Sequence, residues 1–223
     1  MNRLWIADTH LGGARIHQYT NYVFPSKEAR EAAIIRNANG RIKDGDLIMC
    51  VGDFCSYGKE KGVEGSRVKA IDWEKQFKGK WVFVEGNHDG NNSVKFGIES
   101  MVVRIGQYNA FVVHDPKYGT NAPSKCDLVI CGHVHQAWHT QWRKHGNRDV
   151  LYINVGVDVN RYIPITDSDV VSLADREYRK LYRPPTVFIV KDITCKHDGT
   201  VYKSDHRGGC PACRERALAA KKA

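Results

Sequence analysis

This chain of 223 residues lacks the sequence features of membrane, secreted and repeat proteins. No apolar run approaches the roughly 20 residues that a membrane-spanning helix needs, so we expect no membrane partner. We expect no secretory signal, because Met1, Asn2 and Arg3 lead directly into an apolar segment. Internal repeats, low-complexity tracts and long runs of Lys and Arg are absent as well. We therefore expect a cytoplasmic protein.

The composition, 42% hydrophobic and 26% charged, is that of a globular protein with one substantial core. The net charge of +9 and the pI near 9.2 indicate polyanionic partners, nucleic acid first. Basic residues are spread along the chain, however, and most of them are expected to form a solvated surface. Four scattered cysteines are interpreted as reduced thiols of the core. These are Cys50, Cys55, Cys126 and Cys131.

The hydrophobic pattern alternates between strands and helices in the first half of the chain. Apolar runs predict strands at residues 4–7, 47–51 and 81–84. Ser26 is expected to cap a helix that ends at Gly40, and residues 66–78 are expected to form a second helix. The second half is rich in strands, which are predicted at residues 101–105, 110–113, 128–131, 150–153 and 187–190.

This order of elements predicts an α/β fold, a sandwich of two mixed β-sheets flanked by helices. The composition becomes polar, glycine-rich and rich in Cys and His after about Lys191. We therefore expect a main domain at residues 1–190 and a small basic segment at residues 191–223.

Five short blocks of possible metal ligands each follow a predicted strand. Ligands gather at the carboxyl ends of strands in such folds, so we expect the blocks to meet. Their carboxylate, amide and imidazole groups suit Mn, Fe, Zn or similar ions. The blocks are Asp8-Thr9-His10, Gly52-Asp53, Gly86-Asn87-His88-Asp89, His114 and Gly132-His133-Val134-His135.

Together the blocks offer enough ligands for two neighbouring divalent ions, which points to hydrolysis of a phosphate ester. Two ions about 3.5–4 Å apart supply a hydroxide from a shared water and neutralise charge that grows on the phosphate oxygens. The leaving alkoxide then needs a proton, and His88 is the natural donor. Asp89 is expected to orient His88 and to keep it protonated.

This series of motifs resembles the calcineurin-like metallophosphoesterases over roughly residues 1–170. Small, often phage-encoded phosphoesterases are a narrower match, through Asp8-Thr9-His10-Leu11-Gly12, Gly52-Asp53-Phe54 and Asn154-Val155-Gly156-Val157-Asp158. The resemblance implies two divalent ions of the Mn, Fe, Zn, Ni or Mg class, with His88 as the catalytic histidine. It implies that Asp8, His10, Asp53 and His135 hold one ion, and that a bridging Asp53, Asn87, His114 and His133 hold the other.

The chain departs from the family pattern at a few positions. Ser56 stands where many members have a second Asp, no Arg follows Gly52-Asp53, and Asp89 replaces the Glu of the protein phosphatases. The resemblance therefore favours a phosphodiesterase over a protein phosphatase. His114 is followed by Asp115 instead of a glycine, which leaves His139 and His145 open as alternative ligands.

A second set of metal ligands lies near the C-terminus. Cys210 and Cys213 have the spacing of a zinc knuckle, and Cys195 supplies a third thiolate. His197 or His206 would complete a tetrahedral site. The segment resembles a small zinc ribbon, and without zinc it is too short to bury a core.

Two functions follow from these patterns. The first is a phosphoesterase in which a hydroxide that bridges two metal ions attacks the phosphorus and His88 acts as the general acid. The alternative is a nucleic-acid-binding protein or nuclease in which the basic zinc segment supplies affinity for DNA or RNA. The expected partner is a phosphate ester, with nucleotides and nucleic acid as candidates, and the pattern fixes no oligomeric state.

Overall fold

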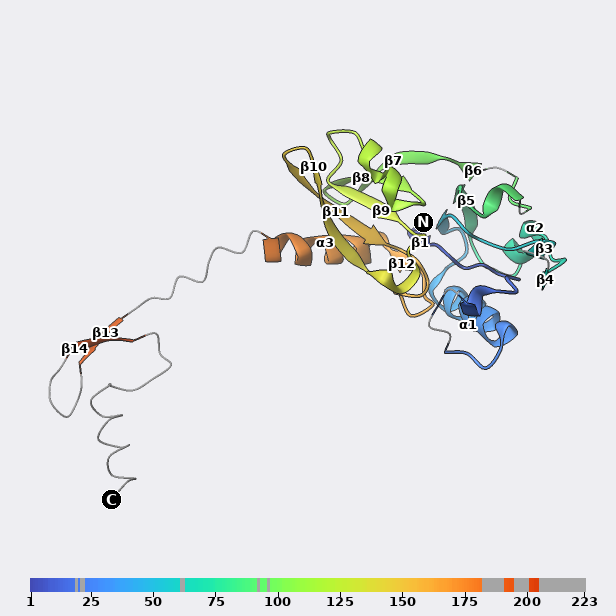
Figure 1. The fold of residues 1–223 in the computed structure, drawn as a ribbon, viewed down its shortest axis with the longest axis horizontal. Helices are drawn as coiled ribbons and strands as arrows, with labels where there is room; N and C mark the ends of the chain where they lie inside the picture. Colours follow the sequence, from blue (N-terminus) through green and yellow to red (C-terminus); the bar gives the residue numbers. More distant parts are fainter. Residues whose placement is uncertain are drawn as a thin grey trace, which may run out of the picture. The chain divides into compact units, whose positions relative to one another are not determined.

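The computed structural model describes residues 1–18, 20, 23–60, 63–91, 93–95, 97–181, 191–194 and 201–204 (Figure 1). The chain divides into two units, Met1–Glu177 and Tyr178–Ala223, and we describe each by itself.

The first sheet of the large unit has the strand order β12-β1-β2-β5-β6. Neighbouring strands run parallel from β1 to β6, and β12 pairs antiparallel with β1 at the edge. The central strands are almost continuously apolar because helices or the second sheet cover both of their faces. The five strands are β1 (Arg3–Ile6), β2 (Leu47–Val51), β5 (Lys80–Val84), β6 (Gly97–Ile98) and β12 (Ile165–Thr166).

The second sheet has the order β10-β11-β9-β8-β7. Its three inner strands are parallel, and the edge strands β10 and β7 are antiparallel to their neighbours. The five strands are β7 (Ser100–Ile105), β8 (Tyr108–Val113), β9 (Leu128–Cys131), β10 (Thr140–His145) and β11 (Arg148–Asn154). Both sheets are thus mixed, as the sequence predicts.

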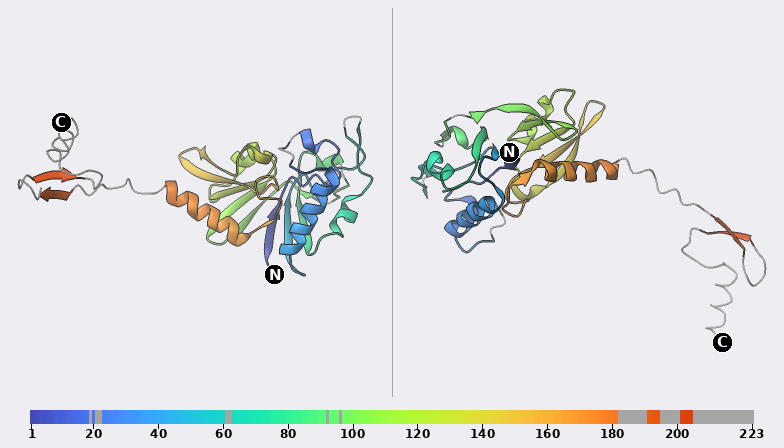
Figure 2. Two further views of the ribbon diagram at one scale, coloured as in Figure 1. Left: turned by 90° about the horizontal axis from the view of Figure 1, so that it is seen from below. Right: turned by 180° about the vertical axis from the view of Figure 1, so that it is seen from behind.

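The two sheets meet at the carboxyl end of β1. The N–H of Ala7 donates to the carbonyl of Val155 at 3.1 Å, and the N–H of Val157 donates to the carbonyl of Ala7 at 3.0 Å. This junction joins β1 to the chain that leaves β11. The sheets consequently lie beside each other as two adjacent layers (Figure 2).

Helix α1 (Lys27–Arg41) covers the first sheet. Ser26 caps it as predicted, since its side chain accepts a hydrogen bond from the N–H of Ala29 at 3.2 Å. Gly40 does not end the helix, which continues to Arg41 because the N–H of Ile42 still bonds the carbonyl of Ala38. The apolar face of α1 packs in one core cluster with residues of β1 and β2.

Helix α3 (Asp167–Leu181) is a second flanking helix, and the sequence reading did not predict it. Its first residue, Asp167, binds the guanidinium of Arg3 on β1 at 2.8 Å. Farther along, Asp175 accepts a hydrogen bond at 2.6 Å from the hydroxyl of Tyr108, which begins β8. Helix α3 therefore touches strands of both sheets (Figures 1 and 2).

The helix predicted at residues 66–78 is much shorter in the structure. Helix α2 spans only Ala70–Glu74. The side chain of Ser66 accepts the N–H of Val68, which forms a local turn before the helix, and the chain leaves the helix after Glu74 through short turns. Two of the predicted apolar positions, Val68 and Ile71, are exposed.

The remaining elements of the large unit are short. A two-stranded ribbon pairs β3 with β4 antiparallel, and four turns of 3-10 helix lie in the loops. Among the described residues, no helix is both long and apolar enough to cross a membrane. These elements are β3 (Lys59–Glu60), β4 (Val63–Glu64), η1 (Ile16–Gln18), η2 (Asp89–Asn91), η3 (Pro116–Asn121) and η4 (His135–Ala137).

The small unit contains an antiparallel pair, β13 (Lys191–Thr194) and β14 (Val201–Ser204), in which Ile193 pairs with Tyr202. The strand predicted at residues 187–190 lies outside the described residues. So do the predicted zinc ligands Cys195, His197, Cys210 and Cys213, together with the alternative ligand His206.

Candidate metal centre

The five blocks meet where the carboxyl ends of five strands come together. Asp8 follows β1, Asp53 follows β2 and Asn87 follows β5, all in the first sheet. His114 follows β8 and His133 follows β9 in the second sheet. The side chains of both sheets therefore face one another across the junction between the layers.

The first cluster consists of Asp8, His10 and His135, whose ligand atoms all lie within 4.8 Å of one another. The imidazole rings of His10 and His135 stack with their centroids 5.3 Å apart. The Asp8 carboxylate accepts the backbone N–H of His133 at 2.9 and 3.0 Å, which fixes its orientation. Asp8 and His10 are buried.

The second cluster consists of Asp53, His114 and His133, again with ligand atoms within 4.8 Å of one another. Asn87 joins it, because its amide oxygen lies 2.8 Å from Nδ1 of His133 and 3.0 Å from Nε2 of His114. His114 therefore lies in this cluster. The alternative His145 instead contacts the hydroxyl of Tyr152 at 2.8 Å.

Asp53 lies between the two clusters. Its Oδ2 is 3.5 Å from Nε2 of His10 in the first cluster and 3.3 Å from Nε2 of His114 in the second. One carboxylate oxygen thus faces ligands of both clusters, which is the placement that a bridging ligand requires.

The donor atoms fit two cations. Nε2 of His10 is buried and has no hydrogen-bond partner among the described residues. Both nitrogens of His114 face oxygen acceptors, the carbonyl of Val51 at 2.8 Å and the amide of Asn87 at 3.0 Å. Burial opposes a charge on this ring, but the hydrogen bond and charge of Asp53 raise the pKa of His114 to about 9, so the protonated ring donates to both oxygens. A cation bound at Nε2 would take the place of that proton.

Five residues of the clusters adopt left-handed backbone, which residues other than glycine seldom do. The angle φ is 58° at Asp8, 42° at His10, 54° at Asp53, 71° at His133 and 45° at His135. Each such residue costs on the order of 1–3 kcal/mol, and the surrounding structure must hold it in place. Backbone strain gathered at one spot in this way is typical of a functional site.

Two motif glycines leave room for the ligands. A Cβ atom on Gly52, where φ is 84°, would overlap the imidazole of His114. A Cβ atom on Gly86 would overlap the carboxylate of Asp53. The glycines of the Gly-Asp and Gly-Asn-His-Asp motifs are therefore needed for the close approach of the two loops.

Burial and charge set the ionisation of the clusters. Burial lowers the pKa of His10 to about 3, which keeps its imidazole neutral and able to bind a cation. Burial raises the pKa of Asp8 to about 6, against the pull of the neighbouring histidines. Burial would also raise the pKa of Asp53, but the hydrogen bond and charge of His114 hold it below its usual range.

Three of the histidines present one nitrogen to a cluster and the other to the protein. A partner of this kind fixes which nitrogen is free for a metal and how the ring is turned. The partners are the carbonyl of Val51 for His114 at 2.8 Å, the carboxylate of Asp158 for His135 at 2.7 Å, and the carboxylate of Asp115 for His133 at 3.8 Å.

His88 and Asp89 lie beside the clusters. His88 is exposed, its ring centroid is 5.4 Å from that of His10, and its backbone N–H donates to Asp53 at 3.0 Å. The Asp89 carboxylate accepts the backbone N–H groups of Asp53 and Gly86, both at 2.8 Å, and of Phe54 at 3.1 Å. Asp89 therefore holds two ligand loops together, a role that the sequence did not indicate.

Comparison with known proteins agrees with this geometry. The family model described as a calcineurin-like phosphoesterase superfamily domain matches residues 1–162. The chain belongs to the calcineurin-like phosphoesterase superfamily.

Relatives of this calcineurin-like phosphoesterase include the uncharacterized protein MJ1445 of Methanocaldococcus jannaschii. It is 31% identical over 174 residues, which cover 77% of this chain and 90% of the relative. Among solved structures, the protein of unknown function AQ665 from Aquifex aeolicus is similar with a TM-score of 0.55 and 20% identity. That match covers 77% of this chain and 98% of the other, and it supports the fold alone.

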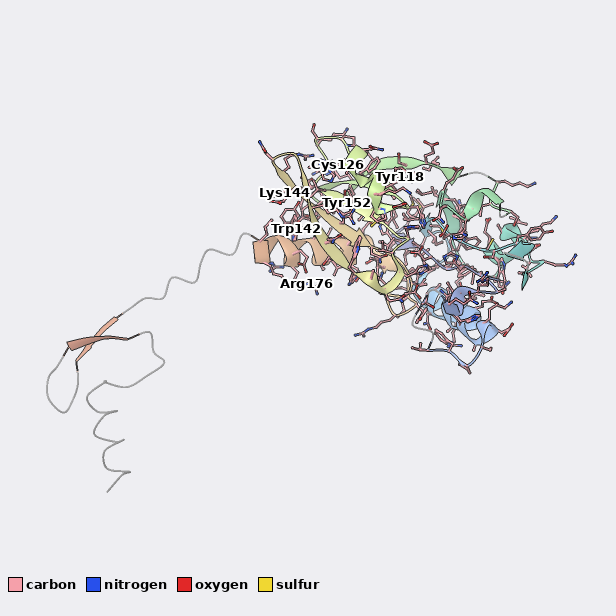
Figure 3. All side chains as sticks on the ribbon, viewed as in Figure 1. Tyr118, Cys126, Trp142, Lys144, Tyr152 and Arg176 are labelled. Atoms are coloured by element: carbon pink, nitrogen blue, oxygen red, sulfur yellow. The ribbon has the colours of Figure 1, made fainter. Side chains whose placement is uncertain are left out.

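A cleft of about 610 Å³ opens beside the second cluster of the phosphoesterase. Asn87 and His114 form part of its wall, so the cleft reaches two of the candidate ligands directly. Tyr118, labelled in Figure 3, stands half-exposed at its rim with Lys117 against its ring. Two exposed carboxylates, Glu85 and Glu99, also line it.

The contacts of two residues that support the site cannot be predicted from the sequence. Asp158 ends the block Asn154–Asp158, and Arg30 belongs to no motif. Arg30 is buried and donates to the carbonyl of Thr9 at 2.6 Å. No spacing rule could have found this pair, because α1 and the loop after β11 are far apart in the sequence.

Proposed function

We propose that this calcineurin-like phosphoesterase is a dinuclear metal-dependent phosphodiesterase. The observation that carries the proposal is the position of Asp53, whose Oδ2 lies 3.5 Å from His10 and 3.3 Å from His114. A shared carboxylate between two clusters of ligands is the arrangement of a two-metal phosphoesterase site.

The proposed ligands of one ion are Asp8, His10, Asp53 and His135, and those of the other are Asp53, Asn87, His114 and His133. When bound, two such ions act as Lewis acids on the phosphate and make a water nucleophilic near neutral pH. The mixture of carboxylate, amide and imidazole ligands favours Mn, Fe, Zn, Ni or Mg over softer ions.

His88 is the proposed general acid. Its imidazole is exposed beside the first cluster, where it can reach a substrate oxygen, and its backbone is held to Asp53. It would give its proton to the oxygen that leaves the phosphorus. Asp89 would act on His88 through the main chain, since it holds the loop that carries His88 against the loop of Asp53.

The proposal is tested with bis-p-nitrophenyl phosphate, with p-nitrophenyl phosphate as the matching monoester, in the presence of Mn²⁺. We expect hydrolysis of the diester by the wild type and its loss in Asp53→Asn. In His88→Ala we expect a large loss for a diester with an alkyl leaving group, measured beside it, and only a small one for p-nitrophenolate, which leaves without a proton. Lys144→Ala, a substitution on the edge strand β10 (Figure 3), serves as the surface control. Unchanged activity in both site variants would contradict the mechanism, and a preference for the monoester would contradict the phosphodiesterase assignment.

For the C-terminal segment, residues 191–223, we propose a structural zinc ion held by Cys195, His197, Cys210 and Cys213. The spacing of the two final cysteines supports it. Elemental analysis of the full chain should find one zinc that Cys210→Ser removes and Asp53→Asn leaves in place. Equal zinc content in the wild type and Cys210→Ser would exclude the site.

A further inference from the structure

The histidines of the proposed centre are supported very unequally. His114 is backed by the carbonyl of Val51, and His133 has a carboxylate only at 3.8 Å. His135, in contrast, has the Asp158 carboxylate 2.7 Å from its Nδ1. Nδ1 therefore donates to Asp158, and the lone pair of the neutral ring is left on Nε2, on the side available to an ion.

The Asp158 carboxylate is in turn held by the buried guanidinium of Arg30. Its side chain is 3% exposed and that of Arg30 is 1% exposed, and their charged atoms approach to 3.8 Å. Arg30 also donates to the backbone carbonyls of Thr9 at 2.6 Å and Asp8 at 3.3 Å. Burying one charge without a partner costs folding free energy, so the guanidinium and the carboxylate stabilise each other in the interior.

These contacts join four separate parts of the chain. Arg30 comes from α1, Asp8 and Thr9 from the loop after β1, His135 from the loop after β9, and Asp158 from the loop after β11. The main chain of Asp8 and the ring of His135, both members of the first cluster, are thereby tied to one buried ion pair.

We propose that Asp158, fixed by Arg30, is a positioning residue that turns His135 toward the ion held by Asp8, His10 and His135. The inference rests on the proposed metal centre. The contacts of Asp158 among the described residues lie with His135 and Arg30, so we expect it to take no part in holding the other ion. Its removal should therefore weaken one ion and spare the other.

The test compares Asp158→Asn with the matched variant Asp115→Asn, which changes the carboxylate behind His133. Each full-length protein is freed of metal and titrated with Mn²⁺, and the affinity and number of ions are measured by calorimetry. We expect Asp158→Asn to bind one ion about 10- to 100-fold more weakly and the other as the wild type does. Asp115→Asn should affect the first cluster little.

Electron paramagnetic resonance supplies a readout that general loss of structure would not give. The wild type loaded with two Mn²⁺ should show the signal of a coupled pair, and Asp158→Asn at the same Mn²⁺ concentration should show isolated Mn²⁺. The thermal unfolding of the metal-free proteins shows whether the variant is folded. If the loss of the Asp158 charge beside Arg30 prevents folding, the double variant Arg30→Gln/Asp158→Asn removes both charges and should show the same loss of one ion.

Two results would overturn the proposal. One is an Asp158→Asn protein that binds both ions with wild-type affinity, and the other is an equal weakening of both ions. A wild type that holds fewer than two ions would overturn this inference and the metal centre together. A wild type that binds two ions without hydrolysing any diester would refute the proposed function alone, because the binding experiment requires no activity.

Discussion

The two clusters of the centre differ in how open they are. Asp8 and His10 of the first cluster are buried, and His135 rests on the buried pair of Asp158 and Arg30. In the second cluster Asp53 and His114 are equally buried, but Asn87 is exposed, and the His133 side chain is 38% exposed against 17% for that of His135. The second cluster is thus open on the side of Asn87 and His133. We expect substrate to arrive from the open side, where the cleft begins.

The largest effect should come from the residue that the two clusters share. Asp53→Asn removes a charge that faces His10 and His114 together. We expect binding of both ions to weaken and the rate of diester hydrolysis to fall on the order of 10³-fold, because several kcal/mol of metal-derived stabilisation are lost. Ion content and kcat measured on the same preparation check this. Loss of a single ion would show that Asp53 belongs to one cluster only.

His88→Ala should separate proton transfer from ion binding. We expect kcat to fall by about 10²–10⁴-fold for a diester with an alkyl leaving group, because a general acid contributes roughly that much. With p-nitrophenolate, which leaves without a proton, the fall should be much smaller. Ion content should match the wild type. Equal losses for both leaving groups would contradict the role of general acid.

Two glycine substitutions test whether the clusters can be damaged separately. In Gly52→Ala the new methyl group strikes the ring of His114, whereas in Gly156→Ala it comes within 2.7 Å of Asp8 Oδ2. We expect each variant to lose preferentially the ion of its own cluster, together with about 1–3 kcal/mol of unfolding free energy for the strained position 52. Gly90→Ala, whose added Cβ meets nothing within 4 Å, is the control. Denaturant unfolding and Mn²⁺ titration measure the two effects.

The smallest effect is expected at Asp115. Its carboxylate lies 3.8 Å from His133 and is already paired with the exposed Lys117 at 2.7 Å. Asp115→Asn should lower the affinity for the second ion only a few-fold, because a carboxylate oxygen 3.8 Å from the imidazole makes no hydrogen bond to it. Calorimetric titration checks this value. If Asp115→Asn lowered the affinity for its ion as much as Asp158→Asn does, the carboxylates behind His133 and His135 would support their clusters equally.

Strand ends and ligand types were readable from the sequence because they depend on local pattern. The runs before Asp53 and His133 are continuous and apolar, and the structure places β2 and β9 there with the predicted bounds. Helix α2 was predicted too long, since side-chain turns such as that of Ser66 compete with a helix without disturbing the apolar spacing.

Other features depend on contacts between distant segments, which no pattern in one chain reveals. Strand β10 (Thr140–His145) is polar, and its identity comes from pairing with β11. Asp158 is one Asp among many until the fold brings it to His135. The left-handed backbone of the ligand residues is likewise imposed by the loops around them, against local preference.

The junction at Ala7 connects the candidate metal centre to the packing of the two sheets. Each cluster takes ligands from both layers, Asp8 and His10 with His135 in one, and Asp53 with His114 in the other. An ion bound in either cluster would therefore link the two sheets, which the hydrogen bonds at Ala7 already join. A shift of one sheet against the other would change the geometry of both clusters, so the distance between the two ions would report the relative position of the sheets.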